Sequence, residues 1–148
     1  MILGTRHQAL IRENAAKLEG LASLNEEFAI RYRYMFNRSQ HTGELKLTWA
    51  EIFKIVGPHF YSPSGPATIS SNIIRYIHDL NRDRIHISVN SVDADTVKIH
   101  LAALGLLKIE AANAKGGGVG EFVTLTEKGK SELLNVMAVR TESIAVED

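Results

Sequence analysis

Residues 101–129 read LAALGLLKIEAANAKGGGVGEFVTLTEKG and decide the fold class. The leucines predict a helix that ends at Gly105, because glycine readily adopts the left-handed conformation that stops a helix. Two apolar strands, 106–112 and 121–126, flank a glycine-rich tip that can turn with positive φ. Thr126 is placed to cap a last helix. The stretch therefore predicts a helix, a two-stranded wing and a further helix.

Two more helices are predicted upstream of this stretch. Thr48 and Glu51 have the spacing of a capping box, which starts a helix that Gly57 and Pro58 end. The apolar face of this helix consists of Trp49, Ile52, Phe53 and Val56. A second helix is expected from about Pro66 to Leu80. Its inward side chains are predicted to be Ile73, Ile74, Ile77 and Leu80.

A third helix is expected from near Asp93 to Gly105, with Ser91 or Asp93 as its N-cap. A short strand at 85–88 precedes it. From Thr48 onward the order is helix, helix, short strand, helix, strand, wing tip, strand, helix. This order predicts an α+β fold, a winged helix-turn-helix in which three helices supply one core.

An extension precedes the winged helix. Residues 5–24 predict a helix, and its apolar face either packs on its own domain or pairs with a second subunit. That face consists of Leu10, Ile11, Ala15, Leu18 and Leu21. Residues 28–36, FAIRYRYMF, alternate as a strand does, 37–44 predict a turn or loop, and 45–49 can return as the partner strand.

Arg31 and Arg33 lie on the strand face opposite the aromatic residues of 28–36. Two interpretations of these arginines remain: they lie on a strand face exposed to solvent, or they bind single-stranded nucleic acid. The expected organisation of the chain has three parts. These are an N-terminal helix plus hairpin over 1–47, a winged-helix domain over 48–139 and a C-terminal tail over 140–148.

The composition excludes several classes of protein. The chain has 148 residues, no cysteine, and equal numbers of basic and acidic residues, 17 of each. Disulfides and zinc–thiolate sites are therefore excluded. No apolar run approaches the roughly 18 residues that a membrane span needs, so a cytoplasmic location is expected. Seven Lys or Arg and five Asp or Glu precede Leu47, so the winged-helix half carries the acidic excess.

Three segments carry a resemblance to a known family: LTWAEIFKIVGP, DTVKIHLAALGLLKIE and FVTLTEKGKSELL. They resemble the C-terminal winged-helix tail of bacterial proteins that carry an N-terminal TIR-like domain of unknown function. The resemblance implies an accessory module of a larger bacterial protein and brings no catalytic residues with it. The matching positions are Trp49, Ile52, Phe53, Gly57, Pro58, Thr96, Lys98, Leu101, Leu104, Gly105, Leu106, Leu125, Thr126 and Gly129.

No pattern for catalysis stands out, so a non-enzyme without metal, cofactor or small-molecule substrate is expected. The histidines lack a metal-binding spacing. The glycines at 116–120 precede a strand, whereas a phosphate loop precedes a helix. Asp93 and Asp95 lie near a helix start, where the helix dipole favours acids.

The third helix therefore carries the functional hypothesis. On a helical wheel Val97, Leu101 and Leu104 point to the core, which leaves a largely apolar outer face. That face consists of Asp95, Thr96, Ile99, Ala102 and Ala103. The first hypothesis is a protein-interaction or oligomerisation module, with Leu10, Leu18, Leu21, Ile99, Ala102 and Ala103 at the interface. The alternative is a DNA-binding transcriptional regulator, with Thr96, Lys98, His100 and Lys115 as contacts.

Overall fold

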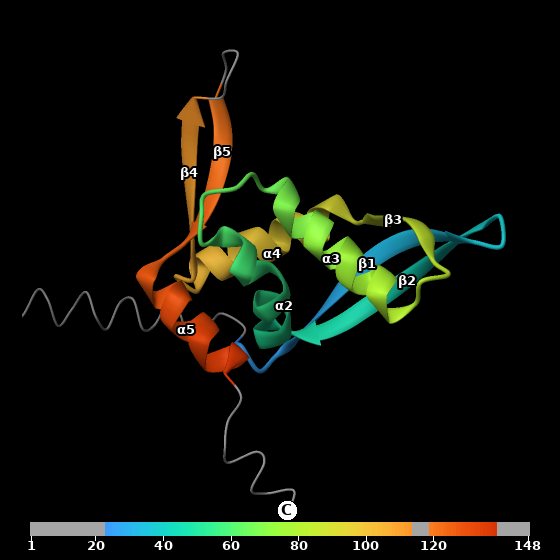
Figure 1. Cartoon of the computed structure of the whole chain (residues 1–148), viewed down its shortest axis with the longest axis horizontal. Helices are drawn as coiled ribbons and strands as arrows, with labels where there is room; N and C mark the ends of the chain where they lie inside the picture. The colour runs from blue at the N-terminus through green and yellow to red at the C-terminus, as the bar shows by residue number, and fades with distance from the viewer. Residues whose placement is uncertain (1–22, 114–118, 139–148) are drawn as a thin grey trace, which may run out of the picture.

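The computed structural model describes residues 23–113 and 119–138. Within them the chain is α+β, with two small antiparallel sheets and helices packed between and beside them (Figure 1). The elements are β1 (Glu27–Phe36), β2 (Ser39–Thr48), α2 (Trp49–Val56), the 3-10 turn η1 (Gly57–Phe60), α3 (Ala67–Leu80), β3 (Ile85–Val89), α4 (Ser91–Ala103), β4 (Leu107–Asn113), β5 (Val119–Leu125) and α5 (Glu127–Met137). None of the helices within the described ranges is long and apolar enough to cross a membrane.

The first sheet has the strand order β2-β1-β3. The strand predicted at 28–36 is confirmed, but the loop predicted at 37–44 is wrong. β2 begins at Ser39, because Asn37 and Arg38 alone make the turn, with φ of 49° and 66°. Two left-handed residues in succession match the right-handed twist of a hairpin.

The short strand predicted at 85–88 is confirmed as β3, and it joins the edge of β1. Tyr32 pairs with Val89 and Arg33 with Ser88. β3 therefore connects the β1–β2 hairpin to the helical part of the chain, and Ile30 and Tyr32 of β1 belong to the same core cluster as the helices.

The core confirms most of the predicted helix faces. The four predicted residues of α2 are buried in the core, and the capping box of Thr48 and Glu51 forms. They are Trp49, Ile52, Phe53 and Val56. Ile73 and Ile77 of α3 and Val97 and Leu101 of α4 are also buried. The prediction for Leu80 was wrong, because this side chain is 62% exposed. Ile77 is the last α3 residue in the core, so the last turn of the helix extends beyond it.

The end of α4 is hydrogen-bonded to the start of α5, although the β4–β5 hairpin separates them in the sequence. Gly105 has φ of 79°, and the amide of Leu106 donates to the carbonyl of Leu101, which confirms the predicted helix stop. The predicted cap Thr126 is also confirmed, since its hydroxyl accepts from the amide of Gly129. The Lys128 ammonium donates to the carbonyl of Leu104 at 3.0 Å. The start of α5 therefore satisfies a carbonyl at the end of α4.

The second sheet is the β4–β5 hairpin, which projects from the end of α4 (Figure 1). Its register runs from Leu107 opposite Leu125 to Asn113 opposite Val119, so both predicted strands are confirmed. A bridge between Ser64 and Val123 fastens its base to the loop before α3. Residues 114–118, which include the predicted tip residue Lys115, lie outside the described residues.

Gly129 gives a sharp test of the α4–α5 junction. A Cβ at this position would lie 2.0 Å from the carbonyl oxygen of Leu106. Alanine favours a helix over glycine by about 1 kcal/mol, but this clash opposes that gain. We expect Gly129→Ala to lower the free energy of unfolding by about 1–3 kcal/mol in urea titrations. Gly65→Ala is the control, because a Cβ there meets nothing within 4 Å. A Gly129→Ala protein as stable as wild type would contradict the close approach.

Candidate functional site

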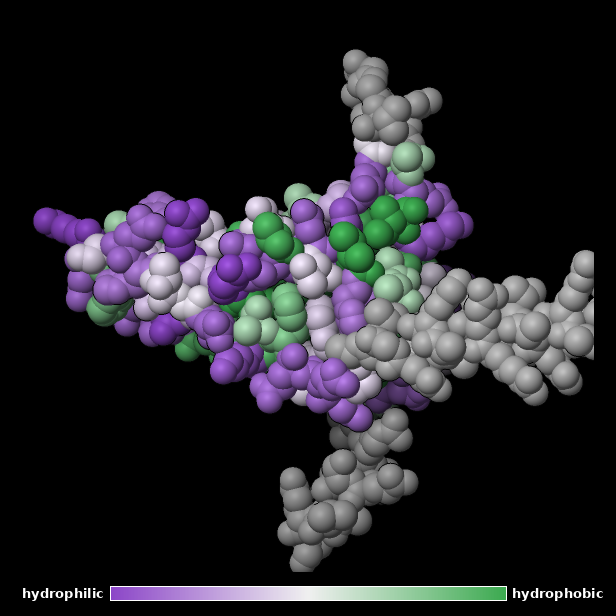
Figure 2. Space-filling model, turned by 180° about the vertical axis from the view of Figure 1, so that it is seen from behind, coloured by the Kyte–Doolittle hydropathy of each residue, from purple (hydrophilic) through white to green (hydrophobic). Residues whose placement is uncertain are grey.

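The outward face of α4 is largely apolar. Val92 and Ile99 are 63% and 59% exposed, and Ala103 is exposed as well. Residues spaced by seven and four share one side of a helix. We define the α4 outer face as Val92, Asp95, Thr96, Ile99, Ala102 and Ala103. Figure 2 views the molecule from the side on which α4 lies and shows hydrophobic residues gathered over α4 and the base of the β4–β5 hairpin.

Val92 was not predicted as part of this face. The sequence placed the helix start near Asp93, whereas α4 begins at Ser91, so Val92 lies in its first turn. Ile99 and Ala103 are exposed and Ala102 is half-buried, so the structure brings all three predicted interface residues of α4 together. The other predicted interface residues, Leu10, Leu18 and Leu21, lie outside the described residues.

The predicted DNA contacts within the described ranges all have contacts inside the protein. The Lys98 ammonium lies 2.6 Å from Glu121 of β5 and its side chain is only 15% exposed. The Thr96 hydroxyl donates to the carbonyl of Val92 at 2.8 Å. The His100 ring packs against the Trp49 ring with 4.1 Å between centroids. α4 therefore presents no cation of its own that is free for phosphate.

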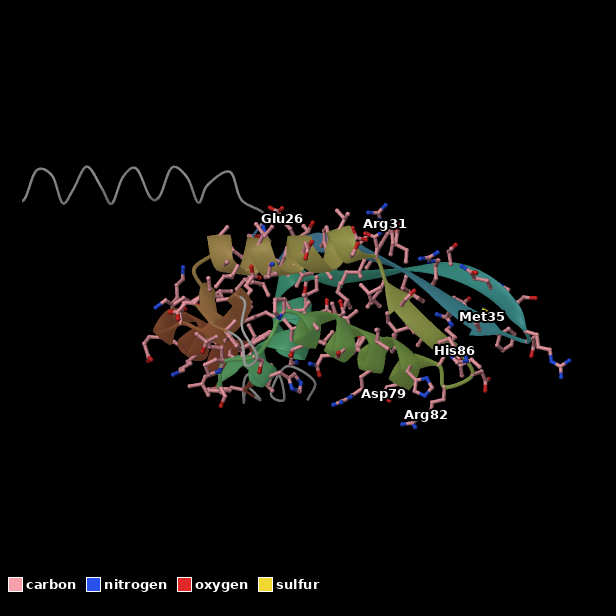
Figure 3. All side chains as sticks on the ribbon, turned by 90° about the horizontal axis from the view of Figure 1, so that it is seen from above. Glu26, Arg31, Met35, Asp79, Arg82 and His86 are labelled. Carbon is pink, nitrogen blue, oxygen red and sulfur yellow. The ribbon has the colours of Figure 1, made fainter. Side chains whose placement is uncertain are left out.

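The start of α4 is fixed by Asp93, which is only 5% exposed. Its carboxylate accepts hydrogen bonds from the Arg31 backbone amide at 2.8 Å and from Nε and Nη2 of the Arg31 side chain at 2.9 Å each. The predicted place of Asp93 in the first turn of the helix is confirmed, and its pairing with Arg31 was not predicted. Arg31 is solvated, with 59% of its side chain exposed, but its guanidinium also covers a buried carboxylate, a contact that was not predicted. Figure 3 shows Arg31 on the side of the sheet where α4 lies.

Asn90 completes the arrangement, and it is the N-cap in place of the predicted Ser91 or Asp93. Its side chain accepts from the amide of Asp93 at 3.0 Å, while its own amide donates to the carbonyl of Arg31 at 2.9 Å. In a capping box the third residue of the helix would bond back to the cap amide. Here the Asp93 carboxylate accepts instead from Arg31 of β1. The first turn of α4 is therefore hydrogen-bonded directly to the edge of β1.

Arg31 and Asp93 each shift the pKa of the other toward its charged form. Hydrogen bonds from the Arg31 side chain lower the pKa of Asp93 below its ordinary value of 3.8, although burial opposes the shift. Hydrogen bonds to Asp93 raise the pKa of Arg31. Asp93 is therefore an anion at neutral pH, held by its partner, and its geometry serves to fix α4 in place.

The aromatic residues of the hairpin are also occupied by protein groups. Tyr32 is buried and its hydroxyl accepts from Arg84. The Arg84 guanidinium lies 4.6 Å from the centre of the Tyr34 ring, and His41 stacks on Tyr34 at 5.4 Å. Bases of a single strand would need these ring faces open. The hairpin gives the single-strand hypothesis little support.

Within residues 23–113 and 119–138, no group of three or more His, Asp or Glu side chains is placed to hold a metal ion. The sequence matches no protein-family model and no curated protein.

The Asp93 pair predicts a pH dependence of stability. The folded pKa of Asp93 lies below the unfolded value, so its contribution is complete above about pH 4 and is lost as the pH falls through the folded pKa. At pH 7 we expect Asp93→Asn to lower the free energy of unfolding by about 1–3 kcal/mol. The difference from wild type should shrink in titrations at successively lower pH.

Asp95→Asn is the matched control, because Asp95 is exposed on the same helix. Its effect on the free energy of unfolding should stay within about 0.5 kcal/mol at every pH. A gap between wild type and Asp93→Asn that is unchanged from pH 7 to pH 2 would contradict the role of the charged carboxylate.

Proposed function

We propose that residues 48–139 are a winged helix and that the chain is a non-catalytic protein-interaction module. The order α2, α3, β3, α4, β4, β5 supports the winged-helix assignment, because a hairpin follows the third helix and is fastened to the same core. α4 then stands in the place of a recognition helix, with β4 and β5 as the wing. The suggested origin in a larger bacterial protein stays a prediction.

The observation that carries the proposal is the composition of the α4 outer face. A helix that reads DNA offers cations and hydrogen-bonding side chains to phosphates and bases. The α4 outer face offers Val92 and Ile99, both more than half exposed, together with two alanines, one acid, Asp95, and Thr96, whose hydroxyl already donates to the carbonyl of Val92. Exposed aliphatic residues in a row on one helix are typical of a protein interface.

The proposed occupant is a second copy of this chain. The sequence predicts a second apolar helix face at residues 10–21, with Leu10, Leu18 and Leu21 along it. The β-branched side chains of one helix and the leucines of the other can interdigitate as ridges into grooves. Placing this face of one copy against the α4 outer face of another would remove both apolar rows from water.

The DNA-binding alternative rests on the element order. Its weakness is electrostatic, since Lys98 is paired with Glu121 and Asp95 lies on the outward side of α4. Affinity for duplex DNA comes mainly from neutralised phosphates. A reader with one acid and no free cation on its central helix would depend on residues elsewhere for that affinity.

Ile99→Asp and Leu18→Asp test self-association by sedimentation equilibrium. Either change puts a charge into the proposed interface, so we expect the dissociation constant to rise at least about tenfold. Leu80→Asp is the control, because Leu80 is as exposed as Ile99 but belongs to α3. It should associate as wild type does.

Two results would overturn the proposal. Wild type that remains monomeric at high concentration would exclude a second copy as the occupant. A random-sequence duplex that binds at about 50 mM salt, with affinity lost in Lys98→Ala, would favour the DNA reader instead.

A further inference from the structure

The outer face of the β2-β1-β3 sheet carries a groove with a volume of about 810 Å³. Its polar side chains come from all three strands and from the start of α4. Among them are Arg31, Arg33, Thr42, Glu44, Ser88 and Asn90. Arg31 and Arg33 are two residues apart on β1, so both point to this face. A groove of this size is within the range that holds a small molecule.

Two rows of side chains cross the groove. Arg33 pairs with Thr42 of β2 on one side and with Ser88 of β3 on the other. Residues in register on one face of a sheet have Cβ atoms about 5 Å apart. The side chain of Arg33 thus starts between those of a threonine and a serine. In the second row Arg31 pairs with Glu44.

Most charges of the groove are compensated within it. Arg31 is held by Asp93 at 2.9 Å. The Glu44 carboxylate lies 3.8 Å from the Lys46 ammonium. Arg33 has neither a hydrogen-bonded side-chain partner nor an ion pair within the part of the chain that the structure describes. Arg33 is therefore the uncompensated cation of the groove, and its nearest neighbours across the sheet are hydroxyls.

We propose that this groove binds the phosphate group of a small phosphomonoester. The planar guanidinium of Arg33 can donate two parallel hydrogen bonds to phosphate oxygens, and such charge-assisted pairs are the strong ones. The hydroxyls of Thr42 and Ser88 can donate to the remaining oxygens. Glu44 repels an anion, so the phosphate is directed to the Arg33 and Ser88 side of the groove. This site is independent of the α4 outer face and of self-association.

The test is a titration of the ¹⁵N-labelled full chain with inorganic phosphate and with a nucleoside monophosphate, followed by amide chemical shifts at constant ionic strength. We expect saturable shifts at residues 33, 42 and 88 with both probes. Larger shifts across the groove with the nucleotide would identify an ester as the ligand, and equal shifts would identify free phosphate.

Arg33→Ala should weaken binding at least about tenfold, because it removes the bidentate contact. Thr42→Val should weaken it less. Arg75→Ala is the matched control, since Arg75 is exposed on α3 and has no ion pair within the described residues. Shifts that do not saturate, or an equal loss in Arg33→Ala and Arg75→Ala, would overturn the proposal.

Discussion

The pairing of the buried Asp93 carboxylate with Arg31 is the interaction on which the relative position of α4 and the first sheet depends. The carboxylate accepts from the backbone amide and from the guanidinium of one residue, Arg31. A buried carboxylate without such donors would cost several kcal/mol in desolvation, so the pair fixes β1 and α4 in one relative position. The Asp93 side chain is 7% exposed, whereas that of Arg31 is 59% exposed. The guanidinium therefore covers the carboxylate and meets solvent on its other side.

The Arg31–Asp93 pair also determines which face of α4 is exposed to solvent and can bind a partner. Asp93, Val97 and Leu101 are spaced by four and are all buried. With this row inward, Val92, Ile99 and Ala103 must point away from the core. The same residue that fixes the helix therefore sets the composition of the surface it presents. Arg31 lines the sheet groove, but its charge is paired with Asp93, which leaves Arg33 as the unpaired cation of the groove.

Several features that depend on neighbours in the sequence were predicted correctly. The capping box at Thr48, the stop at Gly105 and the cap at Thr126 each need only a few adjacent residues. The two strands that flank the glycine-rich segment were likewise predicted from short runs of adjacent residues. The largely apolar character of the α4 outer face also followed from helical periodicity, although Val92 was missed because the helix start was placed too late.

Features that depend on distant partners could not be predicted. Arg31 and Asp93 are 62 residues apart, and an arginine on an alternating strand carries no sign of its partner. The pairing of β3 with β1 and the exposed Leu80 depend on where the sheet and core end in space. One local signal was present. Asn90 and Asp93 have the spacing of an N-cap and its third helical residue, which would have placed the helix start correctly.

A double-mutant cycle on Arg31 and Asp93 tests this account most directly. The melting temperatures of Arg31→Ala, Asp93→Ala and the double variant are compared with that of wild type. If the two side chains act as one unit, the double variant loses clearly less than the sum of the two single losses. A loss in the double variant equal to that sum would show that the residues act independently and would contradict the anchoring of α4 to the sheet.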